Sequence, residues 1–245
     1  MCNIVGRGML AQAFSKTELD DRFLLFASGV SNSSETRTSE FVREEALLIE
    51  QINLNPEKTI IYFSTCSIYQ KNQTEYALHK LSMEKHLRIH AKHYHIYRLP
   101  QVVGVVDNTT LISYFVKAIL FNEPVELKAD AQRNLVAVSD IYRLVEKISR
   151  KEFEQSFIMN IAASFSVEVT KIYKHISCIL GHDSKHSIVS GGEIHAIDIA
   201  LLKDFLSGND PLLKCSYWKS ILDSYVPQIV SLVSSSRSVD EKHTG

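Results

Sequence analysis

Strand-like apolar runs alternate with helix-period segments along the first 180 residues, and this alternation limits the fold more than any other feature of the sequence. Alternating strands and helices are typical of a parallel sheet with helices packed on its faces. The run at 59–63 is almost entirely apolar, as expected for a strand covered on both faces. The sequence therefore predicts an α/β fold with a parallel sheet.

The pattern places six strands and six helices in the chain. Expected strands lie at 3–5, 23–27, 59–63, 95–99, 135–138 and 157–161. Expected helices lie at 9–16, 39–53, 75–91, 108–121, 140–150 and 167–180, with Asp140 in position to cap the fifth. Beyond Gly181 the pattern weakens into short helices, and the tail at 234–245, rich in Ser and charge, is expected to be disordered.

The composition is that of an ordinary soluble globular protein, with 45% hydrophobic and 22% charged residues. A formal net charge of -1 gives no electrostatic reason to expect nucleic acid or an anionic membrane as partner. No signal peptide or apolar stretch of transmembrane length is visible. The four cysteines form no CxxC pair and His90, His93 and His95 straddle a helix end, so we expect no metal site and a reducing cytoplasm.

A glycine pair follows the first expected strand, in the stretch Gly6-Arg7-Gly8-Met9-Leu10-Ala11. Glycines at a strand–helix turn let the backbone approach a pyrophosphate, which then lies at the positive end of the helix. The same pair also suits a simple turn.

Two further stretches carry candidate catalytic side chains. Ser64, Thr65 and Ser67 follow the strand at 59–63, at the edge where ligands bind in open α/β sheets, although such residues also commonly cap turns. Tyr76 and Lys80 are four residues apart, so both project from one face of the helix that follows. A nearby ammonium favours the phenolate form of a tyrosine.

Taken in order, these stretches resemble the extended short-chain dehydrogenases/reductases, the family of nucleotide-sugar epimerases, dehydratases and 4-ketoreductases. That family typically shows S-[ST]-x-x-V-Y-G and then Y-x-x-x-K-L-x-x-E, which residues 64–69 and 76–84 resemble. The stretches at 97–104, 133–140 and 159–163 are similar to its R-x-x-x-V-Y-G, R-D-F-V-x-V-x-D and Y-N-I-G-S motifs. The resemblance covers about residues 3–180.

The resemblance implies a Rossmann-like, doubly wound parallel sheet that is truncated. The strand at 23–27 looks like the family's fourth, so its second and third strands are missing, and the first strand becomes an edge. A right-handed crossover would then move the first helix to the opposite face; otherwise the connection is left-handed. We expect a nucleotide-binding core at 1–107 with parts of 134–165, and a small substrate lobe at 108–133 and 166–233.

The resemblance also implies roles for individual residues. Thr65, Tyr76 and Lys80 would be catalytic, with Ser64 or Ser67 as reserve for Thr65. Residues expected to bind the cofactor are Gly6, Arg7, Gly8, Met9, Leu10, Ala27, Ser28, Gly29, Ser64, Lys80, Leu99, Pro100 and Val102. Residues expected to bind the substrate are Ser67, Asn108 and Arg133.

The expected function is the NAD(P)H-dependent reduction of a 4-keto nucleotide-sugar, or its epimerisation, in surface polysaccharide biosynthesis. NADP is slightly favoured over NAD because Arg7 could pair with a 2′-phosphate. Dehydration is disfavoured because Cys66 and Ser67 stand where dehydratases carry Asp-Glu. The alternative is a non-catalytic homologue that binds a nucleotide-sugar or acts as a partner subunit. A homodimer through the helices at 39–53 and 75–91 is expected from the resemblance.

Overall fold

The computed structural model describes residues 1–106, 110–152, 155–194 and 196–243, with side chains as far as residue 235. The chain divides into two compact units. Unit 1 consists of Met1–Pro100, Val138–Ala162 and His195–Asn209, and unit 2 of Gln101–Ala137, Ala163–Ile194 and Asp210–Gly245. Each unit is described separately below.

Unit 1 contains a five-stranded sheet in which every neighbouring pair is parallel. In spatial order its strands are β1 (Asn3–Val5), β2 (Phe23–Phe26), β3 (Thr59–Thr65), β4 (His93–Leu99) and β9 (Phe157–Asn160). This arrangement confirms the predicted Rossmann-like α/β fold. The order begins at β1, so the first strand pairs directly with the strand at 23–26 and forms an edge, as the truncated family pattern predicts.

Helices α1 (Met9–Ala13), α2 (Thr38–Leu54), α3 (Glu75–His90) and α5 (Val138–Lys151) cover this sheet near the positions that the apolar periodicity indicated. The unit also contains the 3-10 helix η1 (Cys66–Tyr69), which was not predicted, and the short helix α7 (Ala200–Lys203). Two details of the sequence prediction are wrong. Helix α1 ends at Ala13 rather than near Lys16, and α5 begins before Asp140, which therefore lies inside the first turn and bonds Arg143 instead of capping.

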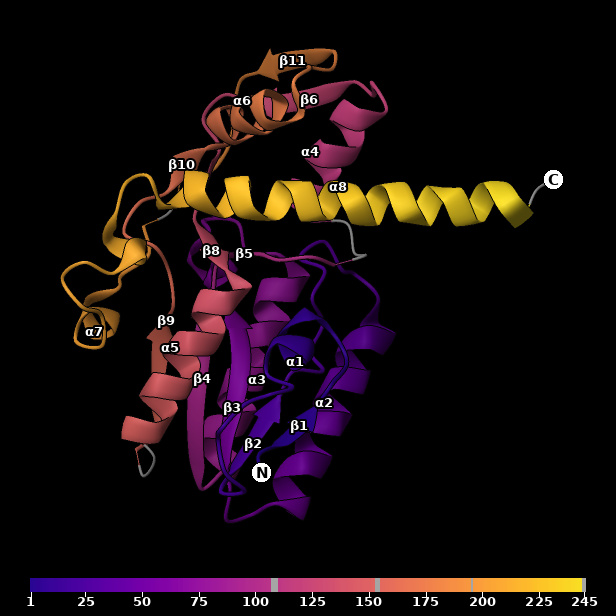
Figure 1. Cartoon of the computed structure of the whole chain (residues 1–245). Coiled ribbons are helices and arrows are strands. Elements are labelled where there is room, and N and C mark those ends of the chain that lie inside the picture. The colour runs from indigo at the N-terminus through magenta and orange to yellow at the C-terminus, as the bar shows by residue number, and fades with distance from the viewer. Residues whose placement is uncertain (107–109, 153–154, 195, 244–245) are drawn as a thin grey trace. The chain divides into compact units, whose positions relative to one another are not determined.

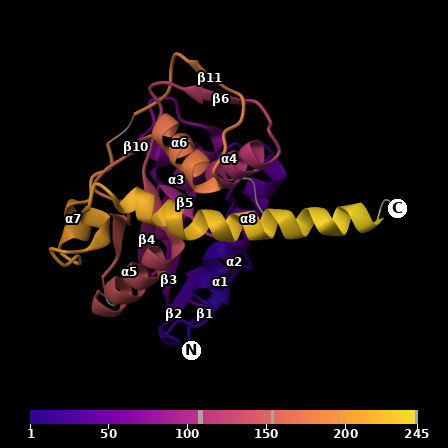
Figure 2. The same cartoon turned by 45° about the horizontal axis from the view of Figure 1, so that its top comes forward.

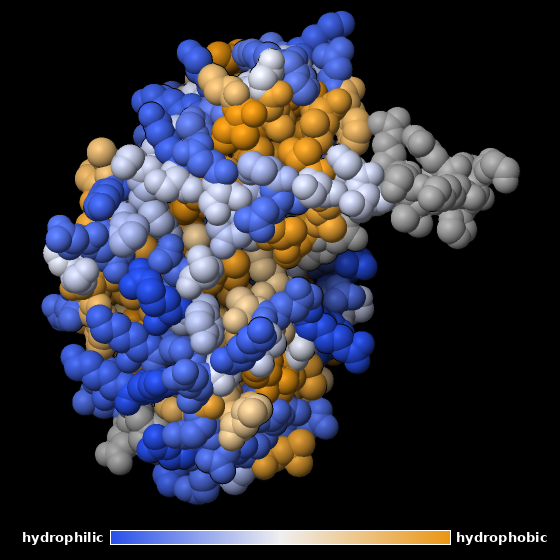
Figure 3. All heavy atoms as spheres, viewed as in Figure 1, coloured by the Kyte–Doolittle hydropathy of each residue, from blue (hydrophilic) through white to orange (hydrophobic). Residues whose placement is uncertain are grey.

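One face of the sheet packs against α2 and α3. The buried side chains there come from three strands and both helices, and they are Leu24, Phe26, Leu48, Ile52, Ile60, Tyr62, Met83, Leu87 and Ile96. The buried stripe of α2 repeats every four residues, which is the spacing of one helical face. Helix α5 also has a single buried stripe, and its outer surface is largely hydrophilic in Figure 3.

The opposite face of the sheet carries α1 and α5 (Figure 1). The ring of Phe14, which caps α1, lies 5.2 Å from that of Tyr142 on α5 and 5.8 Å from that of Phe63 on β3. Tyr62, the preceding residue of β3, points the other way and bonds Glu44 of α2. The steps from β1 to β2 and from β2 to β3 run in the same direction, so the connection through α1 has the opposite hand to that through α2. Because right-handed crossovers are the rule, the first connection is the left-handed one that the sequence left open.

Unit 2 contains three two-stranded pairs and a set of helices. Its strands are β5 (Gln101–Val103), β6 (Val125–Lys128), β7 (Gln132–Arg133), β8 (Leu135–Ala137), β10 (Val167–Glu168) and β11 (His186–Val189). Its helices are α4 (Leu111–Leu120), α6 (Val169–Leu180), η2 (Pro211–Leu213) and α8 (Tyr217–His243). Beyond Gly181 the short helices α7 and η2 agree with the sequence prediction, whereas α8, which Figures 1 and 2 both show as one long helix, was not predicted. It extends through part of the tail that was expected to be disordered.

Candidate active site

The three candidate catalytic side chains lie at the carboxyl end of β3 and the start of α3. Thr65 is the last residue of β3, and Tyr76 is the second residue of α3, one turn before Lys80. Thr74 starts α3 at the right point, because its hydroxyl accepts a hydrogen bond from the backbone N–H of Ala77. The structure therefore brings all three residues to the same end of one strand–helix unit.

Thr65 has a buried hydroxyl that also shapes the turn after β3. Its Oγ1 accepts a hydrogen bond from the backbone N–H of Ser67 and donates one to Ser67 Oγ, both at 3.1 Å. The first bond caps η1, so Thr65 is held in place. The second bond joins two hydroxyls, and a hydroxyl proton can rotate to another acceptor.

The side chain of Ser64 lies on the other face of β3, and its hydroxyl already has a hydrogen-bond partner. Its hydroxyl donates to Glu84 of α3 at 2.5 Å, and Arg98 of β4 donates two hydrogen bonds to the same carboxylate. Arg98 also donates to the hydroxyl of Tyr69, which donates to Asn160. The Glu and Arg of two predicted motifs thus form a buried pair that joins α3 to β4.

Lys80 and Tyr76 are both buried, and the Lys80 ammonium lies 5.9 Å from the centroid of the Tyr76 ring. Lys80 donates to Glu44 at 2.9 Å, to the hydroxyl of Tyr62 at 3.1 Å and to the carbonyl of Phe63 at 3.5 Å. An ammonium has three N–H donors, so these acceptors use all of them.

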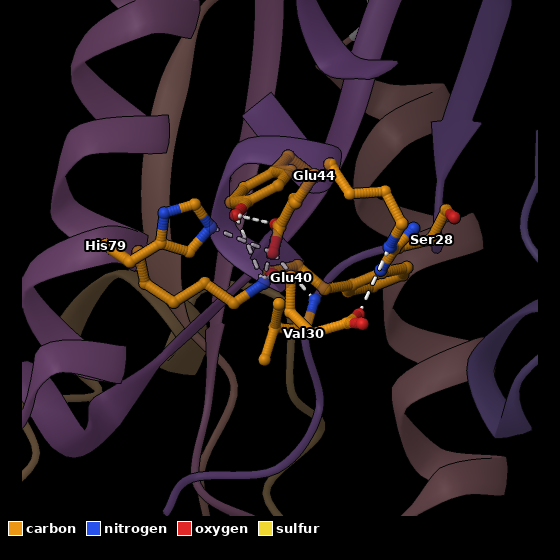
Figure 4. A network of polar contacts seen from close by, with 9 residues as sticks. Ser28, Val30, Glu40, Glu44 and His79 are labelled. Atoms are coloured by element: carbon orange, nitrogen blue, oxygen red, sulfur yellow. Dashed lines mark hydrogen bonds and ion pairs between the residues drawn. The ribbon is translucent and has the colours of Figure 1, made fainter. Parts of the chain in front are cut away.

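Glu44, on α2, is the residue that the sequence analysis missed. Figure 4 shows its carboxylate at the centre of a set of polar contacts: besides Lys80, it accepts from the backbone N–H of Val30, the hydroxyl of Tyr62 and the ring of His79. Burial opposes the charged form of this carboxyl, but the Lys80 charge and the hydrogen bonds outweigh it and hold the pKa of Glu44 well below its usual range. The signal available in the sequence was the spacing of Glu44, which lies four residues before Leu48 and therefore on the same, buried face of α2.

The glycine turn after β1 has two different glycines. Gly6 has φ +133, and a Cβ there would lie 2.3 Å from the carbonyl oxygen of Ala27, so the fold itself requires this glycine. A Cβ on Gly8 would meet nothing within 4 Å. Open space at Gly8 fits the close approach of a dinucleotide, which is what the predicted site needs. The helix that Met9 and Leu10 open has only five residues.

Other residues of the predicted cofactor site follow neighbouring strands. Ala27, Ser28 and Gly29 come directly after β2, beside the glycine turn, with Ala27 N–H donating to Val5 of β1. The side chain of Arg7 is exposed. Leu99 is the last residue of β4, and Pro100 follows it.

The remaining predicted residues belong to unit 2 or fall outside the described residues. Val102 lies on β5, and Arg133 on β7 donates to the backbone carbonyl of Gln132. Burial lowers the pKa of Arg133, with Glu193 opposing the shift. Asn108 lies in the gap at 107–109.

Cys66 is not a proton-transfer group, because burial raises the pKa of its thiol to about 12. Within the described residues no cluster of three or more His, Cys, Asp or Glu side chains could hold a metal ion. Over the same residues, no helix has the length and apolar character needed to cross a membrane.

The profile of the NAD dependent epimerase/dehydratase family matches residues 1–162. The chain therefore belongs to this family, which confirms the predicted resemblance and the predicted class of enzyme. No curated protein matches the chain.

Solved structures show the same fold at low sequence identity. RMD from Pseudomonas aeruginosa, complexed with NADPH, is 12% identical with a TM-score of 0.71, over 94% of this chain and 99% of that one. UDP-N-acetylglucosamine 4-epimerase from Bacillus cereus is 16% identical with a TM-score of 0.69, over 94% and 95%. The enzyme of the same name from Methanobrevibacter ruminantium M1, in complex with UDP-N-acetylmuramic acid, is 18% identical with a TM-score of 0.66, over 86% and 77%.

Proposed function

We propose that this protein uses NADPH or NADH to reduce the keto group of a nucleotide-linked sugar. The observation that carries the proposal is the position of Tyr76, buried at the carboxyl end of the sheet, with the Lys80 ammonium near its ring and Thr65 at the end of the adjoining strand. The similar solved structures include UDP-sugar epimerases and a complex with NADPH, which is consistent with this substrate class and cofactor.

Each of the three side chains has a distinct role in this proposal. Tyr76 gives its proton to the carbonyl oxygen of the sugar, and the positive charge of Lys80 stabilises the phenolate left behind. Thr65 turns its hydroxyl proton from Ser67 to the same carbonyl oxygen and orients it. A bound nicotinamide supplies the hydride for such a reduction.

The proposed cofactor residues are those of the glycine turn and the neighbouring strand ends. The turn at 6–10 would face the pyrophosphate, Ala27, Ser28 and Gly29 the adjoining ribose, and Lys80 the nicotinamide ribose. Arg7, exposed on the turn, slightly favours NADP because a guanidinium pairs well with a 2′-phosphate. Ser64, Leu99, Pro100 and Val102 complete the proposed set.

Substrate contacts are proposed for Ser67, Asn108 and Arg133. Arg133 is the best supported of these, because its half-buried guanidinium suits a diphosphate. Reduction is favoured over dehydration, since the Cys66 thiol cannot serve as an acid or base near neutral pH. Reduction is favoured over epimerisation because a reductase must exchange its cofactor every cycle. A weaker hold on the cofactor suits a sheet that, in the described residues, ends at β1, where the family's second strand would normally contact the adenosine ribose. Surface polysaccharide biosynthesis is the proposed setting.

One observation favours the rival proposal, a homologue that binds a nucleotide-sugar without a redox step. All three donors of Lys80 are used by Glu44, Tyr62 and Phe63, so none is left for a ribose hydroxyl in this arrangement. The short α1, with five residues, and the position of β1 at the edge of the sheet also favour this rival proposal.

A nucleotide titration separates the two proposals. NADPH and NADH are added to the protein while nucleotide emission and Trp218 fluorescence are followed. Saturable binding that weakens in Lys80→Met but not in Lys85→Met, an exposed lysine on the same helix, supports the reductase. Loss of keto-sugar reduction in Tyr76→Phe, with nucleotide binding retained, supports the proton-transfer role. No binding at millimolar nucleotide, with or without a nucleotide-sugar, would leave the non-catalytic homologue.

A further inference from the structure

The Glu44–Lys80 pair lies where two parts of the proposed cofactor site meet. Lys80 is only 2% exposed, and the Glu44 side chain is fully buried. A Cβ on Gly29 would lie 2.6 Å from the Lys80 ammonium and 2.7 Å from a Glu44 oxygen, so the backbone after β2 rests directly on the pair. Val30 N–H fixes that backbone by donating to Glu44 at 2.6 Å.

A ribose hydroxyl that accepts a hydrogen bond from Lys80 must therefore take the place of an acceptor already present. Glu44 is the only one of the three acceptors that carries a charge, and charged acceptors form the stronger hydrogen bonds. Tyr62 reinforces the pair, because its hydroxyl donates to Glu44 and accepts from Lys80. The buried carboxylate also opposes the approach of any anionic nucleotide.

We propose that Glu44 is a positioning residue that competes with the cofactor ribose for Lys80 and so keeps the nicotinamide cofactor weakly bound and exchangeable. This inference rests on the proposed function, since it takes Lys80 as the ribose contact. In this proposal Glu44 weakens the binding of the cofactor, which lets the oxidised cofactor leave after each reduction, as a reductase requires.

The test compares nucleotide affinity in three proteins. Glu44→Gln keeps the shape of the side chain and removes its charge, and Glu45→Gln, the next residue of α2 with a partly exposed carboxylate, is the matched control. We expect Glu44→Gln to bind NADPH about tenfold or more tightly than the unmodified protein, the factor that one charge-assisted hydrogen bond contributes, and Glu45→Gln to bind it equally. A purely structural role for Glu44 would not tighten binding.

Equal or weaker binding by a folded Glu44→Gln variant, where the unmodified protein binds nucleotide, would overturn the inference alone. Failure of all the proteins to bind would overturn it together with the proposed function. If Glu44→Gln does not fold, Tyr62→Phe decides, because it removes one oxygen from the network and frees one donor of Lys80. Tighter binding by Tyr62→Phe supports the inference, and unchanged or weaker binding contradicts it.

Discussion

His95 is a buried histidine of β4 that is held in its neutral form. Its Nε2 faces the backbone carbonyls of Glu152 and Gln155, its Nδ1 faces the hydroxyl of Ser149, and its ring stacks on Phe157 at 4.3 Å between centroids. Two carbonyls at Nε2 require the proton there, so Nδ1 accepts from Ser149. Burial lowers the pKa of His95 from 6.5 to about 4.

This depressed pKa predicts a loss of stability in mild acid. The unfolded chain takes up a proton at His95 below about pH 6.5, whereas the folded chain does so only near pH 4. The contribution of neutral His95 to the free energy of unfolding is therefore complete above pH 6.5 and is lost as the pH falls to about 4. The full loss is about 3 kcal/mol. Urea unfolding at a series of pH values should show it, and His95→Gln should remove this component. An identical pH dependence in the variant would contradict the prediction.

Individual residues of the site were predictable where they stand in short ordered motifs. Thr65, Tyr76 and Lys80 were singled out by the order of their motifs, and the structure places them at one strand–helix unit, while their catalytic roles stay a prediction from the resemblance. Glu44 was not, because the partner of a buried charge comes from a helix 36 residues earlier, and a linear pattern carries no such distance. Glu84 and Arg98 each belong to a predicted motif, but their ion pair could not be predicted, because it depends on α3 and β4 lying side by side.

At the scale of elements, the β1–α1 turn gives a matched pair of variants. Gly6→Ala should lower the free energy of unfolding by about 3 kcal/mol or more, because alanine is strained at φ +133 and its Cβ meets Ala27. Gly8→Ala should change it by less than about 0.5 kcal/mol, since φ is -74 and the space is open. Gly8→Ala should instead weaken nucleotide binding, because its Cβ fills the proposed pyrophosphate approach. Denaturant unfolding tests the two stability expectations, and the nucleotide titration tests the expected effect of Gly8→Ala on binding. A Gly6→Ala variant as stable as the unmodified protein would contradict the stability expectation for Gly6.

The elements themselves were predicted where apolar periodicity was uninterrupted, and missed where it was not. Helix α8 contains Pro227 and many serines, which hid the helical spacing of its buried positions at 217, 221, 222, 226, 229 and 233. The pair formed by β6 and β11 is a parallel contact between distant segments, and β11, which is mostly exposed, has no strong apolar pattern. The hand of the first connection depends on which face α1 covers, and periodicity does not specify that face.

At the scale of the whole molecule, the expected homodimer stays a prediction that the surface of α2 and α3 supports. The two helices are joined by the His86–Glu45 pair and by the stacked rings of Phe41 and His79. Apolar side chains remain exposed on both: Val42 is 57% and Leu78 53% exposed, and Ile49 and Ile89 add to them. A second copy that covered these side chains would remove apolar surface from water and so stabilise a dimer.

The double variant Val42→Glu with Leu78→Glu should therefore convert a dimer into a monomer that remains folded, because both side chains are exposed on the single chain. Leu201→Glu is the matched control, since Leu201 is an apolar residue of α7 that is 58% exposed. Sedimentation equilibrium over a range of concentrations measures the outcome. A monomeric unmodified protein at every concentration, or a double variant that dimerises as well as the control, would contradict an interface through α2 and α3.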